Sequence, residues 1–242
     1  MKKILVYMAF AVLAAGMVSS CKPSFKTGIY TDEMTLPSPS EGGDSLFFSI
    51  NMEFAYGGNA KVASAINRSL SDWAFDLEDS PEGIDESAVA YRENLIDEYL
   101  SEPESVTWEN SIDGHFTGNY KGWTNYIFNF YSYKGGVHGL QTVCAIVFDS
   151  ATGEELSQDD ILKEYTHTAV AELLVKSIKE SLSAEDGSLT ELLEEDQIVP
   201  NNNFSVGKDG ITWYFQPYEA GPYVLGGLVG TVSWKELKPF LK

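Results

Sequence analysis

The sequence predicts an α+β fold, in which antiparallel sheets pack with helices in two consecutive sub-domains. Apolar and polar residues alternate from Leu46 to Phe54, which indicates a half-buried strand. Apolar residues recur at three- and four-residue spacing over 59–77 and 168–182, which indicates amphipathic helices. Because strands and helices come in blocks and do not alternate strictly, we expect an α+β fold and not a parallel sheet with crossover helices.

The N-terminus has the pattern of an export signal. Two lysines precede an apolar run from Ile4 to Val18, which is shorter than the ~20 apolar residues that a permanent membrane helix needs. Val18-Ser19-Ser20-Cys21 resembles the lipobox of bacterial lipoproteins. We therefore expect a signal peptide over 1–20, cleaved before Cys21, and a lipid such as palmitate on that cysteine. An ordinary secretory signal is the alternative.

Residues 21–44 are expected to form a flexible tether. They hold prolines, glycines and serines and show no sustained periodicity. Such a tether would let the folded part stand away from a membrane.

Residues 45–139 are expected to form the N-terminal half of the folded part. Asn59 can cap the first helix, and a second helix follows Asp85. Three strands are expected between 106 and 150, paired antiparallel, with a turn signal at Asp113-Gly114 inside the first. The apolar stripes of the two helices are Val62, Ile66, Leu70, Trp73 and Leu77, and then Ala88, Tyr91, Leu95 and Tyr99.

Residues 140–242 are expected to form the C-terminal half. Ser157 can cap a short helix that begins at Gln158. The further elements expected are a helix over 168–182, a helix in the acidic stretch 191–196, strands at 204–206, 211–216 and 228–232, and a terminal helix over 234–241.

The balance of charge restricts the class of partner. The chain has 16 Lys plus Arg against 36 Asp plus Glu, a formal net charge of −20. Nucleic acid is therefore not an expected partner, and an anionic bilayer would repel the chain, so the lipid must provide the anchor. An acidic surface attracts basic proteins, although acidity also serves solubility alone.

The cysteines and histidines predict neither a disulfide nor a metal site. Lipid on Cys21 leaves Cys144 as the other cysteine, and we expect it to be a small core residue because it lies in an apolar run. His115, His138 and His167 have no close metal-ligand spacing. We expect no metal and no cofactor.

Three ordered segments resemble one known family. They are YSYKGGVHG at 131–139, FDSATGEELSQDDIL at 148–162, and WYFQPYEAGPY at 213–223 followed by WKELK at 234–238. Together they resemble the RsiV-like extracytoplasmic domain, which occurs in a lysozyme-sensing anti-sigma factor and in the non-catalytic part of a peptidoglycan deacetylase. The resemblance covers about residues 45–240 and implies two α+β halves.

In sensor members, the resemblance implies an exported surface that binds lysozyme, coupled through a membrane helix to a segment that holds a sigma factor. We expect this chain to depart from that plan, because cleavage before Cys21 would leave no cytoplasmic segment. Peptidoglycan deacetylation is not expected either, because the resemblance does not extend to a deacetylase domain.

Four residues are candidates for ligand binding. Tyr133 and His138 flank a glycine-rich connection between strands, which is either a ligand loop or a structural turn. Tyr218 and Tyr223 lie beside Gly221 in an expected loop, where tyrosine serves either to stack on a sugar ring or to complete a core.

Paired carboxylates occur at Glu154-Glu155 and Asp159-Asp160. Glycosidases use two carboxylates, but adjacency in sequence does not set the separation that such chemistry needs, and helix capping explains these residues equally. No catalytic residue is therefore assigned.

We expect a non-enzymatic cell-envelope lipoprotein that binds a basic protein such as lysozyme, or a cell-wall glycan. Because Lys22 and not aspartate follows the cysteine, we expect the outer membrane rather than the inner one, with the domain in the periplasm or outside the cell. The alternatives are a carbohydrate-active hydrolase that acts on peptidoglycan and a scaffold of an envelope complex.

Overall fold

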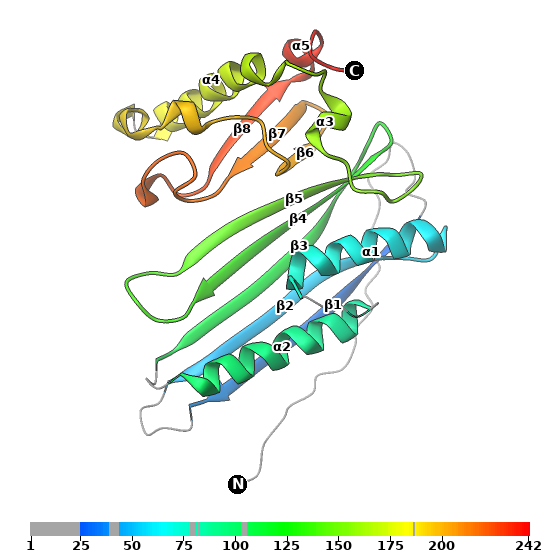
Figure 1. Cartoon of the computed structure of the whole chain (residues 1–242), viewed down its shortest axis with the longest axis vertical. Helices are drawn as coiled ribbons and strands as arrows, with labels where there is room; N and C mark the ends of the chain where they lie inside the picture. The colour runs from blue at the N-terminus through cyan, green and yellow to red at the C-terminus, as the bar shows by residue number, and fades with distance from the viewer. Residues whose placement is uncertain (1–24, 39–43, 78–80, 82, 103–105, 186) are drawn as a thin grey trace. The chain divides into compact units, whose positions relative to one another are not determined.

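The computed structural model describes residues 25–38, 44–77, 81, 83–102, 106–185 and 187–242 (Figure 1). The expected signal peptide and Cys21 lie outside the described residues. The elements in chain order are β1 Lys26–Pro37, β2 Ser45–Tyr56, α1 Ala60–Phe75, α2 Ile84–Ser101, β3 Trp108–Tyr120, β4 Trp123–Tyr133, β5 Leu140–Asp149, α3 Gln158–Ile161, α4 His167–Glu185, η1 Gly187–Leu192, η2 Glu195–Gln197, β6 Phe204–Val206, β7 Gly210–Phe215, η3 Tyr223–Leu225, β8 Leu228–Ser233 and α5 Trp234–Leu237.

The protein has a mixed α+β fold with two sheets, so the expected fold class is confirmed. One sheet has five strands in the order β1-β2-β3-β4-β5, and the other has three in the order β6-β7-β8. The strands of the smaller sheet are antiparallel, as are β1 and β2, but β2 and β3 run parallel. Because α1 and α2 separate β2 from β3 in the chain, they form the crossover that a parallel pair requires.

The chain divides into two compact units. Within the described residues, the first unit is Phe25–His115 with Phe128–Leu140, and the second is Phe116–Ile127 with Gln141–Lys242. The division therefore differs from the expected halves in two respects. The first unit begins before residue 45. In addition, Phe116–Ile127, which contains the end of β3 and the beginning of β4, belongs to the second unit.

Helices α1 and α2 cover one face of the sheet in the first unit (Figure 1). The expected stripes are buried at Ile66, Leu70 and Leu95, and each buried side chain of this size contributes ~1.5–3 kcal/mol. Asn59 caps α1 as expected, because its side chain accepts a hydrogen bond from a backbone N–H of the first turn. Trp73, which fits the stripe by spacing, is instead 48% exposed.

The expected tether over 21–44 is wrong for residues 26–37, because they form β1. This strand pairs antiparallel with β2 along its whole length. Asp32 interrupts the apolar residues on its helix-facing side, and Arg92 of α2 forms an ion pair with it. Asp32 therefore breaks the alternation of apolar and polar residues that would predict a strand. Its place on that side is explained only by the distant Arg92.

The expected turn at Asp113-Gly114 is also wrong, because β3 continues through both residues. A Cβ on Gly114 would lie 2.4 Å from the ring of Phe128 on the neighbouring strand. The glycine therefore makes room for an aromatic side chain in the sheet and does not form a turn.

The second unit has its own core, in which α4 packs against β8. A Cβ on Gly230 of β8 would lie 2.9 Å from Leu174 of α4, so the glycine permits this close packing. The expected acidic helix over 191–196 is instead part of two 3-10 turns, η1 and η2. The expected terminal helix over 234–241 ends at Leu237, two residues before Pro239.

Candidate functional site

The side of β1–β3 opposite α1 and α2 forms a surface that we call the open face. Successive side chains of a strand point to opposite faces, and Leu46, Phe48 and Ile50 of β2 are buried on the helix side. The open face consists of the alternate residues Ile29, Thr31, Glu33, Thr35, Phe47, Ser49, Asn51, Glu53, Glu109, Ser111, Asp113 and His115, together with Tyr131 of β4.

The strand register aligns the open-face residues in rows across the sheet. Glu33 lies opposite Ser49, which lies opposite Ser111, and the adjacent row places Asn51 opposite Asp113. Such cross-strand neighbours on one face have Cβ atoms about 5 Å apart. Residues from three separate parts of the chain therefore form one continuous polar surface.

The open face is acidic. Its thirteen residues include four carboxylates, at Glu33, Glu53, Glu109 and Asp113, and no lysine or arginine. His115 is the one residue of this set that can carry a positive charge. The surface therefore has a negative potential and attracts cations or basic side chains.

Hydrogen bonds hold part of this acidic surface in place. Asn51 Nδ2 donates to Asp113 Oδ1 at 2.8 Å, and His115 Nε2 lies 2.9 Å from Asp113 Oδ2. His115 Nδ1 lies 3.9 Å from Glu53 Oε2. The positions of these carboxylates are thus partly fixed before any partner binds, which lowers the entropic cost of binding.

A shallow groove of about 390 Å³ crosses the open face. Phe47 lines it and is 45% exposed, and Tyr131 contributes a second aromatic ring. Glu109 of β3 lies directly opposite Phe47, and Glu33 of β1 lies diagonally from it, opposite Ser49. The groove therefore combines an apolar contact with flanking negative charges.

The glycine-rich connection between β4 and β5 has the local bonding of a structural turn. Tyr133 Oη donates to Gly136 O at 3.1 Å, and His138 Nδ1 lies 2.9 Å from Gly139 O. Both candidate residues thus bond to the backbone of the connection itself. His138 is exposed.

Tyr218 and Tyr223 are brought together in the second unit. Their ring centroids lie 5.4 Å apart with an interplanar angle of 34°. Tyr218 is 59% exposed, while the neighbouring Ala220 and Leu225 are buried. The rings are therefore displayed from a loop that is itself anchored in the core. Tyr133 and His138 belong to the other unit.

Cys144 is half-buried in β5 and free of a disulfide. Burial, followed by the negative charge of Glu155, raises the pKa of its thiol to about 12. Since the thiolate is the reactive form, this cysteine is not activated as a nucleophile.

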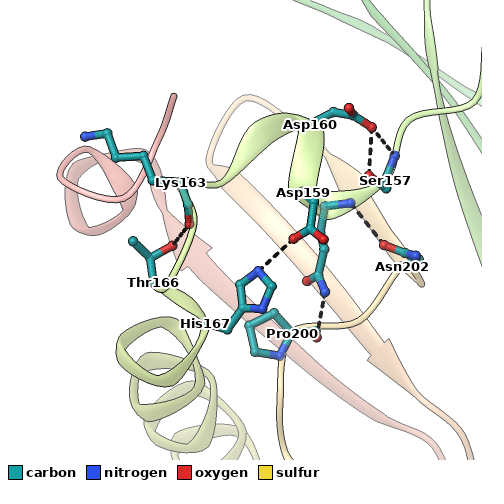
Figure 2. Close-up of polar contacts among 9 residues, drawn as sticks. Ser157, Asp159, Asp160, Lys163, Thr166, His167, Pro200 and Asn202 are labelled. Carbon is teal, nitrogen blue, oxygen red and sulfur yellow. Dashed lines mark hydrogen bonds and ion pairs between the residues drawn. The ribbon is translucent and has the colours of Figure 1, made fainter.

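The paired carboxylates at the start of α3 serve the local structure (Figure 2). Asp160 Oδ2 accepts from the Ser157 hydroxyl at 2.7 Å and from the Ser157 backbone N–H at 2.8 Å, and these bonds lower the Asp160 pKa. Asp159 Oδ1 lies 2.9 Å from His167 Nε2, at the first residue of α4. Because the Ser157 hydroxyl faces Asp160 and not His167, the cluster lacks a serine–histidine pair for nucleophilic catalysis.

Side-chain amides link β6, and Asn203 directly before it, to β4 and β5 within the second unit. Asn203 Oδ1 accepts from Ala145 N at 2.7 Å, and Asn203 Nδ2 donates to Val143 O at 2.8 Å. Asn125 is buried and accepts from Val206 N at 2.7 Å. Sequence reasoning missed both residues, since an isolated asparagine carries no spacing signal.

Two negative observations concern the part of the chain that the structure describes. It contains no group of three or more His, Cys, Asp or Glu side chains placed to hold a metal ion. It also contains no helix of sufficient length and apolar character to cross a membrane.

The two sheets and their helices define a two-unit α+β protein, and comparisons with known proteins agree with that class. The model of a family described as "Protein of unknown function (DUF3298)" matches residues 159–235. No curated protein matches the chain. These findings give no sign of catalysis.

Two solved structures of DUF3298 family proteins have similar folds. One, from Bacteroides fragilis, superposes with a TM-score of 0.77 at 18% identity, over 91% of this chain and 94% of that one. The other, from Pseudomonas aeruginosa PAO1, has a TM-score of 0.68 at 14% identity, over 90% and 94%. At these identities the likeness establishes the fold alone.

Proposed function

We propose that this chain is a non-enzymatic binding protein of the cell envelope whose open face recognises a basic protein. The observation that carries the proposal is the charge of the open face, which has four carboxylates and no lysine or arginine in addition to the exposed ring of Phe47. The RsiV-like resemblance of the sequence supports lysozyme as the candidate partner.

The charges and the aromatic ring have different roles in such binding. Ion pairs at an exposed rim contribute only ~0–1 kcal/mol each, so the carboxylates mainly accelerate and orient the encounter. Phe47 supplies apolar area, and full burial of a phenylalanine contributes ~1.5–3 kcal/mol. We therefore expect an affinity that falls as salt rises but does not vanish.

A peptidoglycan hydrolase is the less favoured alternative. A general acid needs a carboxyl whose pKa is raised, whereas hydrogen bonds from Ser157 lower the pKa of Asp160. Asp159 is engaged by His167. The Asp159-Asp160 pair thus stabilises the beginning of α3 and of α4.

The envelope location is part of the same proposal. We infer that lipid on Cys21 anchors the chain, in the outer membrane rather than the inner one. Labelling of cells with radioactive palmitate tests the attachment of lipid. The label should appear on the wild-type protein and be absent from a Cys21→Ala variant.

Binding of lysozyme to the lipid-free chain, followed by calorimetry as salt is raised, tests recognition of a basic protein. The affinity should fall steadily between low and high salt, because counterions screen the open face. Lysozyme whose lysines have been succinylated is the matched control and should not bind. Absence of binding at every salt concentration would exclude lysozyme as the partner.

Charge-neutral variants test whether the open face is the surface involved. Glu33→Gln with Glu109→Gln should weaken lysozyme binding about 5- to 30-fold, as expected for two rim charges of ~0.5–1 kcal/mol each. Glu172→Gln with Glu180→Gln removes the same charge from the exposed side of α4 in the second unit and is the control. Equal loss in both variants would show that only net charge matters.

A further inference from the structure

The loop between β7 and β8 displays two tyrosines that the core does not use. The core of the second unit includes Ala220 and Leu225 from this loop, but neither Tyr218 nor Tyr223. The two rings contact one another at 5.4 Å, and Tyr218 is mostly exposed. The loop therefore presents an aromatic surface at which a ligand could bind.

The backbone holds Tyr218 outward in an unfavourable conformation. Its φ of 71° lies in the left-handed region, which a tyrosine seldom adopts. The adjacent turn is closed by Glu219 N, which donates to Gln216 O at 3.0 Å, and by Gln216 N, which donates to Glu219 Oε2 at 2.7 Å. Strained residues that the surrounding structure holds in place are concentrated at functional sites.

The base of the loop is rigid. Glu194 N donates to Ala220 O at 3.0 Å, which ties the loop to the segment after η1. A Cβ on Gly221 would lie 2.8 Å from Leu192 O, so the backbone approaches that segment closely. The two rings are therefore presented by a preformed support, which lowers the entropic cost of binding a ligand.

Polar side chains are fixed at the turn that carries Tyr218. Asn201 Nδ2 donates to Glu219 Oε1 at 3.3 Å, so an amide and a carboxylate are fixed at the same turn. Sugar rings present C–H groups on their faces and hydroxyls around their edges. A site for a sugar therefore needs an aromatic surface with planar polar side chains at its margin, and this loop provides both.

We propose that the loop over 216–226 is a saccharide-binding subsite, in which Tyr218 and Tyr223 contact the face of a pyranose ring while the carboxylate of Glu219 accepts hydrogen bonds from its hydroxyls. The site lies in the second unit, whereas the open face belongs to the first. The inference therefore stands apart from recognition of a basic protein, and each can fail without the other.

Titration of the full-length lipid-free chain with two β-1,4-linked tetrasaccharides, of N-acetylglucosamine and of glucose, tests the proposal without any basic protein present. Saturation-transfer NMR should detect binding of at least one tetrasaccharide. Tyr218→Ala should reduce the affinity at least tenfold, and Tyr218→Phe, which keeps the ring, should retain most of it.

Tyr165→Ala is the matched control. Tyr165 lies in the same unit, is 90% exposed, and also has a positive φ, of 64°. Its replacement should leave saccharide binding unchanged, and circular dichroism should show that all variants remain folded. Failure of both tetrasaccharides to bind, or equal loss in the Tyr218 and Tyr165 variants, would overturn the proposal.

Discussion

Burial decides the chemistry of Cys144. Its thiol is half-buried in β5, and burial together with the charge of Glu155 raises its pKa to about 12. The thiol therefore stays protonated at neutral pH. The sequence predicted a small core residue, whereas the structure leaves Cys144 only half-buried in β5.

Alkylation of Cys144 by iodoacetamide at pH 8 should be slow in the folded protein. Because the thiolate is the nucleophile, a pKa of about 12 instead of the ordinary value of 9.0 should slow the reaction at least about 100-fold relative to the urea-unfolded chain. The Cys21→Ala variant leaves Cys144 as the reacting residue. Similar rates in both states would contradict the assigned burial.

The same pKa difference affects stability at alkaline pH. The folded-state pKa is raised, so the unfolded chain loses the Cys144 proton first as pH rises above the ordinary thiol pKa of 9.0. The contribution of Cys144 to the free energy of unfolding therefore declines between pH 9 and about 12, and it is constant below that range.

Asp32 shows why one strand could not be predicted. Its charge lies on the helix-facing side of β1, where alternation requires an apolar residue, and Arg92 of α2 pairs with it from sixty positions later in the chain. No local pattern reports such a partner. Tyr30 lies on the same side, and burial, followed by the charge of Asp32, raises its pKa to about 12.

At the scale of elements, amphipathic periodicity was sufficient to predict α1, α2, α4 and most strands. The Asn59 and Ser157 caps were also predicted, because capping depends on the few residues that surround them. What failed depended on distant contacts: the parallel pairing of β2 with β3, the strand β1, and the continuation of β3 through Gly114. The repulsion among the carboxylates of 191–196 gives one physical reason for short 3-10 turns there in place of a helix.

Side-chain amides take the place of backbone pairing beside β5. Asn203 bonds to both Val143 and Ala145 as a neighbouring strand would. Asn125 of β4 bonds to Val206 N of β6, and its Nδ2 donates to Gly118 O at 3.2 Å. These bonds satisfy backbone groups that burial would otherwise leave without partners.

Replacement of Asn125 by Leu should therefore destabilise the protein by about 2–4 kcal/mol, because it leaves a buried N–H and a carbonyl without their partner. Urea unfolding measures this loss. Asn202→Ala is the control, since Asn202 also accepts from a backbone N–H, of Gln158, but is exposed, and its loss should be less than about 1 kcal/mol. Equal losses of unfolding free energy in the two variants would show that burial of the amide is unimportant.

At the scale of the whole molecule, each unit offers a surface of different chemistry. The first unit presents the acidic open face, and the second presents the Tyr218–Tyr223 pair. The sequence predicted that both tyrosines lie in a loop, because glycine and proline mark that loop. It did not identify the open face, since that surface exists only when β1, β2 and β3 lie in register.

Zero-length carbodiimide cross-linking to lysozyme, followed by mass spectrometry, tests most directly whether the open face is the binding surface. Carboxylates of the chain join to lysines of the partner only where the two are in contact. We predict cross-links at Glu33 and Glu109, with a yield that falls at high salt. Cross-links confined to the second unit, for example at Glu172 or Glu180, would contradict the account.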